Sequence, residues 1–167
     1  MRHALARHIT PPRVVQDESS LATLNLAQIE ALIPHRAPFL WIEEVVSSTE
    51  TTLSARKTVP LDLDVFRGHY PGQPILPGVL LCEAAMQAGA LLIALQAEQP
   101  LPAGTVPVAT RLNNVKFKQI VRPGDLLEID VELTERLANA YYLQARVRVA
   151  GKTAVQLDFA CAAAPLE

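Results

Sequence analysis

Two side chains that can carry protons stand fourteen positions apart near the middle of the chain. His69 lies in a segment rich in Gly and Pro, where a loop can project an imidazole toward a neighbouring element. Glu83 lies in the apolar run that follows, and an ionisable group there is costly unless it is paired or functional. The two residues therefore predict acid–base chemistry. Two interpretations without a function stay open at this point: Glu83 is solvated at a helix end or a subunit interface, and His69 is an ordinary surface residue.

Gln87 stands four residues after Glu83, so in a helix the two side chains share one face and can touch. Its amide can then orient the carboxyl group by hydrogen bonding. A second histidine, His35, follows a predicted short helix. We expect it to have a structural role at the end of that helix.

The elements that must position these residues are a long helix and a set of strands. Residues 78 to about 96 contain no proline and are almost uniformly apolar, which is typical of a helix buried on all sides. Period-two alternation predicts an antiparallel meander of strands, over 127–133, 143–149 and 155–159. One buried helix covered by the inner face of such a sheet is an α+β layout.

Shorter elements precede the long helix. Asn25 and Gln28 can form a capping box for a short helix that Pro34 ends. The apolar stripe of this helix consists of Leu26, Ile29, Leu32 and Ile33. Interleaved β-branched and polar residues favour strands over 39–46 and 51–59.

The chain divides into two parts. Residues 1–22 lack hydrophobic periodicity and contain a polar run, which predicts a flexible N-terminal extension. Residues 23–167 are long and apolar enough for a single domain with one core.

Composition excludes several classes of function. The 167 residues include 15 basic and 17 acidic ones, a formal net charge of -2 that gives no global attraction for nucleic acid. Cys82 and Cys161 stand far apart in apolar runs, so we expect small hydrophobic side chains in a reducing compartment, not a zinc or redox site. The N-terminus lacks the continuous apolar segment that secretion needs, which predicts a cytoplasmic protein. The longest apolar stretch, residues 79–97, is interrupted by polar residues and favours a buried helix over membrane insertion.

The two proton-carrying residues belong to one longer motif. Residues 68–83 are GHYPGQPILPGVLLCE. This segment resembles the signature of the hydroxyacyl-(acyl carrier protein) dehydratases, G-H-F/Y-P-x-x-P-I/V/M-x-P-G-V-L-x-x-E, at matching separations over sixteen positions. Residues 33–40, IPHRAPFL, are similar to that family's L-P-H-R-x-P-F-L, and residues 115–125, VKFKQIVRPGD, to its K-F-R/K-x-x-V-x-P-G-D. Together the resemblance covers about residues 24–163.

The resemblance implies a hot-dog fold, in which an antiparallel sheet wraps a long central helix. It also implies a homodimer or a trimer of dimers, with the catalytic pair His69 and Glu83 contributed by two neighbouring subunits. After the glutamate the family usually has A-M-A-Q, whereas residues 84–87 are AAMQ, which alters the local tunnel shape but keeps Gln87 in register. A glutamate at position 83 resembles the general dehydratases and not the branch that also isomerises the double bond.

The implied reaction removes water from a 3-hydroxyacyl thioester to give a trans-2-enoyl thioester in fatty acid or related acyl-chain biosynthesis. Removing the α proton builds negative charge on the thioester oxygen, and expelling hydroxide requires a proton. Neutral His69 can be the base, and Glu83, if its apolar surroundings keep it protonated, can be the acid. The backbone N–H of Gly78, at the helix start, can donate to the thioester oxygen, and glycine lets the substrate approach closely. No metal and no organic cofactor is required.

The expected partner is an acyl carrier protein, which is acidic and should dock on a local basic patch. The candidate docking residues are Arg111, Lys116, Lys118 and Arg122. In a strand, Lys116 and Lys118 would project to the same face, although ordinary solvated charge is an equally open interpretation. Two other functions also stay open: a hot-dog thioesterase, in which water attacks the carbonyl and releases a free thiol, and a non-catalytic acyl-binding module.

Overall fold

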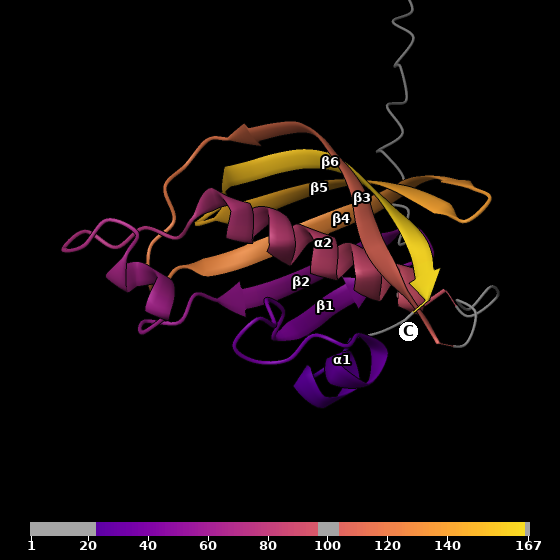
Figure 1. Ribbon diagram of the computed structural model, residues 1–167, viewed down its shortest axis with the longest axis horizontal. Coiled ribbons are helices and arrows are strands. Elements are labelled where there is room, and N and C mark those ends of the chain that lie inside the picture. Colours follow the sequence, from indigo (N-terminus) through magenta and orange to yellow (C-terminus); the bar gives the residue numbers. More distant parts are fainter. Residues whose placement is uncertain (1–22, 97–103, 166–167) are drawn as a thin grey trace, which may run out of the picture.

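A curved antiparallel sheet lies against one long helix in the computed structural model, which describes residues 23–96 and 104–165 (Figure 1). The elements, in chain order, are α1 (Leu26–Leu32), β1 (Glu44–Ser48), β2 (Thr52–Thr58), the 3₁₀ helix η1 (Asp64–Arg67), α2 (Gly78–Ala94), β3 (Thr105–Phe117), β4 (Leu126–Leu137), β5 (Ala140–Val149) and β6 (Lys152–Pro165). The described strands form one six-stranded sheet in the order β1-β2-β4-β5-β6-β3. The predicted N-terminal extension, residues 1–22, lies outside the described residues.

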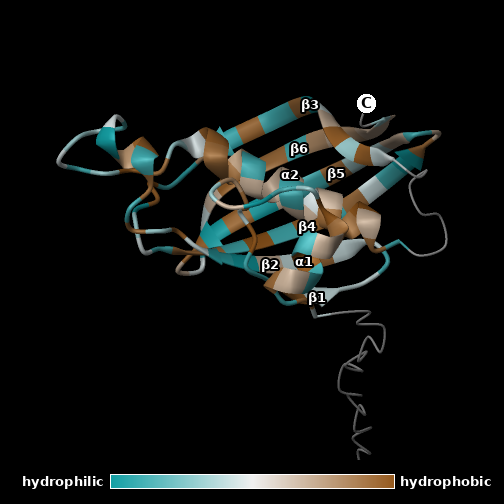
Figure 2. Ribbon diagram, turned by 60° about the horizontal axis from the view of Figure 1, so that its bottom comes forward, coloured by the Kyte–Doolittle hydropathy of each residue, from teal (hydrophilic) through white to brown (hydrophobic). Residues whose placement is uncertain are grey.

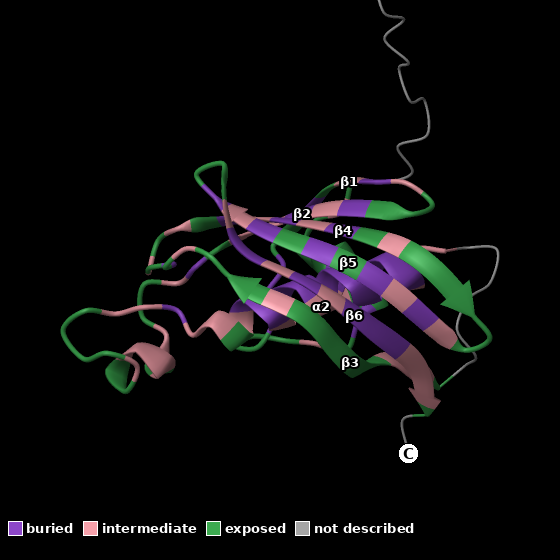
Figure 3. Ribbon diagram, turned by 90° about the horizontal axis from the view of Figure 1, so that it is seen from above, coloured by how far each residue is buried: buried purple, intermediate pink, exposed green. Residues whose placement is uncertain are grey.

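The strands β4, β5 and β6 form the antiparallel meander that the period-two pattern predicts. Ile129 and Val147 point to the helix side and are fully buried, whereas their chain neighbours Asp130 and Arg146 lie on the outer face. Figure 3 shows this alternation of buried and exposed residues along β4 and β5. The sheet therefore has one apolar face for α2 and one polar face for solvent.

The strand β3 is a long edge strand that the sequence pattern does not predict. It pairs with β6 alone among the described strands, and its register shifts twice along that pairing. Most of its residues are half-buried or exposed, so its sequence lacks the alternation that burial imposes on a half-covered strand. Apolar side chains are exposed along β3: Val108 is 39% exposed and Leu112 is 43% exposed.

The predicted strand over 39–46 is wrong in its first half, because β1 begins only at Glu44. The backbone groups of Phe39 and Trp41 hydrogen-bond to the side chain of Gln87 and not to a neighbouring strand. The strand predicted over 51–59 is present as β2. The long helix predicted over 78 to about 96 is also present and ends at Ala94.

The helix α2 is embedded in the core because small residues on it let the sheet approach closely. A methyl group at Gly89 would lie 2.7 Å from the ring of Phe159 in β6 and 3.2 Å from Leu143 in β5. Leu91, Leu92 and other large side chains near its C-terminal end are fully buried. Figure 2 shows the apolar character of this helix against the alternating strands. Among the described helices, none is both long and apolar enough to cross a membrane.

The short helix α1 begins with the predicted capping box. The Asn25 side chain accepts from the Gln28 amide at 3.1 Å, and the Gln28 side chain accepts from the Asn25 amide at 2.9 Å. Ile29 and Ile33 anchor the helix in the core. Leu26 is 47% exposed, so the predicted apolar stripe is only partly covered.

Candidate active site

Glu83 lies in the second turn of α2, where Gln87 holds its carboxyl group. The Glu83 side chain is 20% exposed, and its Oε1 accepts a 2.9 Å hydrogen bond from Nε2 of Gln87. Gln87 is itself only 1% exposed. Its Nε2 also donates to the Phe39 carbonyl at 2.8 Å, and its Oε1 accepts from the Trp41 amide at 2.8 Å. The four-residue helical spacing thus produces a contact that the segment after α1 holds in place.

The backbone partners of Gln87 allow its amide only one orientation. The Trp41 N–H can only donate and the Phe39 carbonyl can only accept, so the amide oxygen faces Trp41 and the nitrogen faces Phe39 and Glu83. Gln87 therefore donates to Oε1 of Glu83 whether the carboxyl group is protonated or not. The described residues place no hydrogen-bond partner on Oε2, which leaves that oxygen available for a substrate.

A cavity of about 260 Å³ opens beside Glu83. Most of its wall is apolar and comes from α2, the segment after α1, β3 and β6, including Met86, Ala90 and Val106. Cys161 also lines it, and burial raises the pKa of this thiol to about 12, so the thiol stays neutral. An apolar cavity with a few convergent polar groups is typical of a small-molecule site.

His35 lies in the wall of the same cavity, although the sequence suggested only a structural role for it. Its Nε2 is 3.7 Å from Oε1 of Glu83, and its side chain is 28% exposed. Arg36 braces this segment by donating to the carbonyl oxygens of Ile33, His35 and Glu30. No spacing rule links a loop residue to a helix so far along the chain, which is why sequence reasoning missed this contact.

His69 follows η1 in the loop before α2, and its ring is oriented by one hydrogen bond. The ring Nδ1 lies 2.7 Å from the carbonyl oxygen of Ile75. Because a carbonyl can only accept, Nδ1 carries the hydrogen and the neutral ring presents an unprotonated Nε2. Within the described part of the chain, no hydrogen bond or ion pair joins His69 to Glu83. One chain therefore holds a base-competent imidazole and an oriented carboxyl group without bringing them into contact.

Gly78 is the first residue of α2, after Pro77 at the N-cap. The first amide groups of a helix have no acceptor within it, so this end can bind an oxyanion. A Cβ at position 78 would lie 2.7 Å from the ring of Phe117. A side chain at position 78 would therefore force the Phe117 ring to move.

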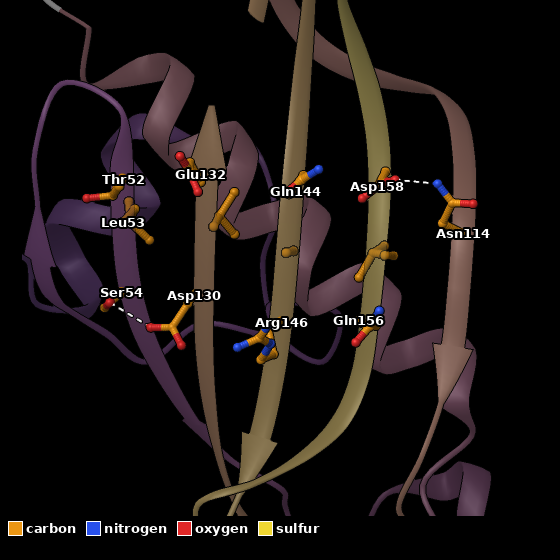
Figure 4. A pocket seen from close by; sticks show the side chains of 13 residues that line it. Thr52, Leu53, Ser54, Asn114, Asp130, Glu132, Gln144, Arg146, Gln156 and Asp158 are labelled. Carbon is orange, nitrogen blue, oxygen red and sulfur yellow. Dashed lines mark hydrogen bonds between the residues drawn. The ribbon is translucent and has the colours of Figure 1, made fainter. Parts of the chain in front are cut away.

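A larger hollow, of about 420 Å³, lies on the outer face of the sheet, away from α2 (Figure 4). Its polar side chains are largely paired: Asp130 accepts from Ser54 at 2.8 Å and faces Arg148 at 2.8 Å. None of the described residues that line it is a histidine or a cysteine. Over the described ranges, no three His, Cys, Asp or Glu residues are grouped to hold a metal ion. The smaller cavity beside Glu83 is therefore the better candidate for chemistry.

The four predicted docking residues lie along and after β3, and all of them are exposed. Lys116 pairs with Gln156 in the sheet register, and the Lys118 ammonium donates to the Gln156 side chain at 2.6 Å. Lys118 lies just beyond the end of β3, so of the two lysines only Lys116 is in the strand. Arg111 lies farther back in β3, and Arg122 lies in the loop before β4.

Solved structures identify the class of fold. A dehydratase heterocomplex, ApeI:P, from Xenorhabdus doucetiae matches with a TM-score of 0.67 and 16% identity, over 80% of this chain and 89% of that one. The PaaI protein of the E. coli phenylacetic acid degradation operon matches with a TM-score of 0.56 and 17% identity, over 71% and 80%. Identities this low establish the fold alone: the chain has the hot-dog fold, as its sequence predicts.

The family is identified by sequence. The model of the FabA-like domain matches residues 33–158. The 3-hydroxyacyl-(acyl-carrier-protein) dehydratase FabZ of Petrotoga mobilis is 33% identical over 135 residues, which cover 81% of this chain and 94% of that protein. The FabZ of Clostridium perfringens is 36% identical over 131 residues, which cover 78% and 92%. The chain belongs to the FabA-like family.

Proposed function

We propose that this chain removes water from 3-hydroxyacyl thioesters carried on an acyl carrier protein, giving trans-2-enoyl thioesters for fatty acid or related acyl-chain biosynthesis. One observation carries the proposal: an oriented carboxyl group, held by Gln87, opens onto an apolar cavity. Membership of the FabA-like family and the named activity of the FabZ relatives support it. The enzyme is a hydro-lyase of 3-hydroxyacyl thioesters.

The reaction needs a base, an acid and a donor to the thioester oxygen. The unprotonated Nε2 of His69 takes the α proton, and the C–H electron pair forms the new double bond as the C–O bond breaks. Glu83 gives a proton from Oε2 to the departing hydroxyl group, which leaves as water. The backbone N–H of Gly78 donates to the thioester oxygen while negative charge develops there. The sum of these steps uses no metal and no organic cofactor.

A second copy of the chain supplies the missing contact in this proposal. His69 and Glu83 make no contact within one chain, and β3 leaves one edge unpaired among the described strands, with Val108 and Leu112 exposed. Such an edge is a template for pairing with another strand. A homodimer joined along β3, alone or in a trimer of dimers, would bring the His69 loop of one subunit to the cavity of its neighbour.

The proposed substrate carrier and compartment follow from surface charge and cysteine chemistry. Lys116 and Lys118 present positive charge on β3 and just beyond it, and an acidic acyl carrier protein could dock there. Both Cys82 and Cys161 are free and buried. Free thiols fit a reducing compartment such as the cytoplasm.

The decisive experiment incubates the purified chain with a 3-hydroxyacyl thioester on an acyl carrier protein and analyses the acyl group by mass spectrometry. We expect loss of water and a 2,3-unsaturated product with the wild-type chain. With the matched variant Glu83→Gln, which keeps the size of the side chain, the acyl group should stay unchanged. A parallel reaction contains a thiol-specific reagent, which measures any free thiol released by cleavage of the thioester. Release of free thiol without the unsaturated product would assign a thioesterase instead, a reaction named for a Streptococcus pneumoniae protein of the same fold. Binding without turnover would assign an acyl-binding module.

A further inference from the structure

His35 lies close to Glu83 but has no part in the reaction described above. Its Nε2 is 3.7 Å from Oε1 of Glu83, while its Nδ1 is buried and has no hydrogen-bond partner among the described residues. An orphaned buried N–H is rarer in proteins than an orphaned buried acceptor. The neutral ring therefore carries its hydrogen on Nε2, and this N–H faces Oε1 of Glu83.

Two N–H groups then face the same carboxyl oxygen. The Gln87 amide donates to Oε1 at 2.9 Å, and the His35 N–H approaches it from the cavity wall. In a protonated carboxyl group the carbonyl oxygen accepts hydrogen bonds better than the hydroxyl oxygen, so two facing donors favour the carbonyl form of Oε1. When Glu83 is protonated, its proton is therefore favoured on Oε2, the oxygen that is free to meet a substrate.

We propose that His35 is a positioning residue that keeps the acid proton of Glu83 on Oε2, the oxygen that protonates the leaving group. This inference rests on the proposed function, because it matters only if Glu83 acts as an acid. It goes beyond that function because it assigns a chemical role to His35, for which the sequence predicted only a structural role.

Among the residues that the structure describes, Glu83 is the only charged partner of His35. The β3 residues that line the cavity, from Val106 to Ala109, carry no titratable group. From β6, Cys161 contributes a neutral thiol, since burial raises its pKa to about 12. Next to His35, the Arg36 guanidinium is occupied by backbone carbonyl oxygens. The effect of His35 on the site thus passes through Glu83.

The test compares two variants on two substrates. His35→Gln keeps a neutral N–H donor near the position of Nε2, whereas His35→Leu removes it. One substrate is a 3-hydroxyacyl thioester, whose hydroxide leaving group needs a proton. The other is the 3-acetoxyacyl thioester, whose acetate leaves as a stable anion without one. The α proton is removed from both, so base chemistry is common to the two reactions.

With the hydroxyl substrate we expect His35→Leu to lower kcat about tenfold, part of the hundredfold or more that a general acid contributes. The KM should change little, because binding of the acyl chain is retained, and His35→Gln should recover most of the loss. With the acetoxy substrate both variants should match the wild type. Thermal unfolding of both variants confirms that they are folded.

Equal losses of His35→Leu on both substrates would overturn the inference, because a merely structural role affects every reaction at the site. Wild-type activity in His35→Leu, or a Gln variant as slow as the Leu variant, would also overturn it. Failure of the proposed function is recognised separately, because the wild-type chain would then give no unsaturated product from the hydroxyl substrate.

Discussion

Glu83 and His69 differ in the sequence separation of the residues that hold their side chains in place. Glu83 is held by Gln87, whose own partners, Phe39 and Trp41, stand 48 and 46 positions away in the sequence. Within the described ranges, the ring of His69 has one hydrogen bond, to Ile75 six positions away. A single chain therefore completes the acid half of the proposed site through tertiary contacts. It shapes the base half only locally and leaves it open to another surface.

Removing either proton carrier should have the largest effect. We expect His69→Ala and Glu83→Gln each to lower kcat by at least about a hundredfold while the protein stays folded, because each removes one half of the proton transfer. The double variant should be little worse than either single variant, since the two groups act in one step. Steady-state kinetics and circular dichroism check this. Near wild-type turnover in either variant would show that the residue is not part of the acid–base pair.

Mixing these two variants tests whether the two halves meet across subunits. Oligomers assembled from His69→Ala and Glu83→Gln chains contain some sites with both groups intact, so part of the activity should return. The mixture is unfolded, refolded together and assayed, with each variant refolded alone as the control. If mixed oligomers are isolated through two different tags and remain inactive, both groups of a site come from one chain.

Removing Gln87 should affect both folding and catalysis. Gln87→Ala leaves the Trp41 amide buried without an acceptor and should lower the free energy of unfolding by roughly 3 kcal/mol. Urea denaturation measures this loss, and kcat should fall as well because Glu83 is no longer oriented. The matched control is Gln144→Ala, on the exposed outer face, which should change stability by less than about 0.5 kcal/mol. Equal losses of stability in the two variants would show that the Gln87 hydrogen bonds add no stability beyond that of an exposed side chain.

A methyl group at the start of α2 should have a smaller effect. Gly78→Ala places a Cβ 2.7 Å from the Phe117 ring, which is 55% exposed and can move aside. We expect kcat/KM to fall about tenfold, because displacing the ring disturbs the helix start that faces the substrate in the proposed mechanism. Gly68→Ala is the control in the preceding loop, where a new methyl group meets no atom within 4 Å. If kcat/KM of Gly78→Ala equals that of the wild type, the substrate does not closely approach the backbone at this position.

Reversing the basic charges near the edge strand should have the smallest effect. Lys116→Glu with Lys118→Glu should slow turnover of a carrier-bound substrate roughly fivefold at low salt, mainly through the association rate. A small soluble thioester should be turned over at the wild-type rate, and Lys152→Glu, at the start of β6, serves as the charge control. Equal losses on both substrates would mean that the two lysines support the fold or the site and do not dock a carrier.

The sequence predicts those parts of the molecule that short-range patterns determine: uniform apolarity, period-two alternation and the three-residue spacing of a cap. The buried α2, the β4–β6 meander and the capping box at Asn25 all follow from such local patterns. The edge strand β3 does not, because neither of its faces is regularly buried. The non-strand backbone at Phe39 and the approach of His35 to Glu83 depend on contacts between distant segments. A local pattern holds no information about such contacts.

The close packing of Gly89 against Phe159 bears on which inherited changes this enzyme can tolerate. Gly89 touches no reacting group, yet any side chain there would push α2 away from β5 and β6. Because the helix moves as a rigid body, that displacement would also move Glu83 relative to the segment that holds Gln87. Natural variants at position 89 should therefore persist only together with a smaller residue at position 159. Selection on catalysis then constrains a pair of core positions that have no chemistry of their own.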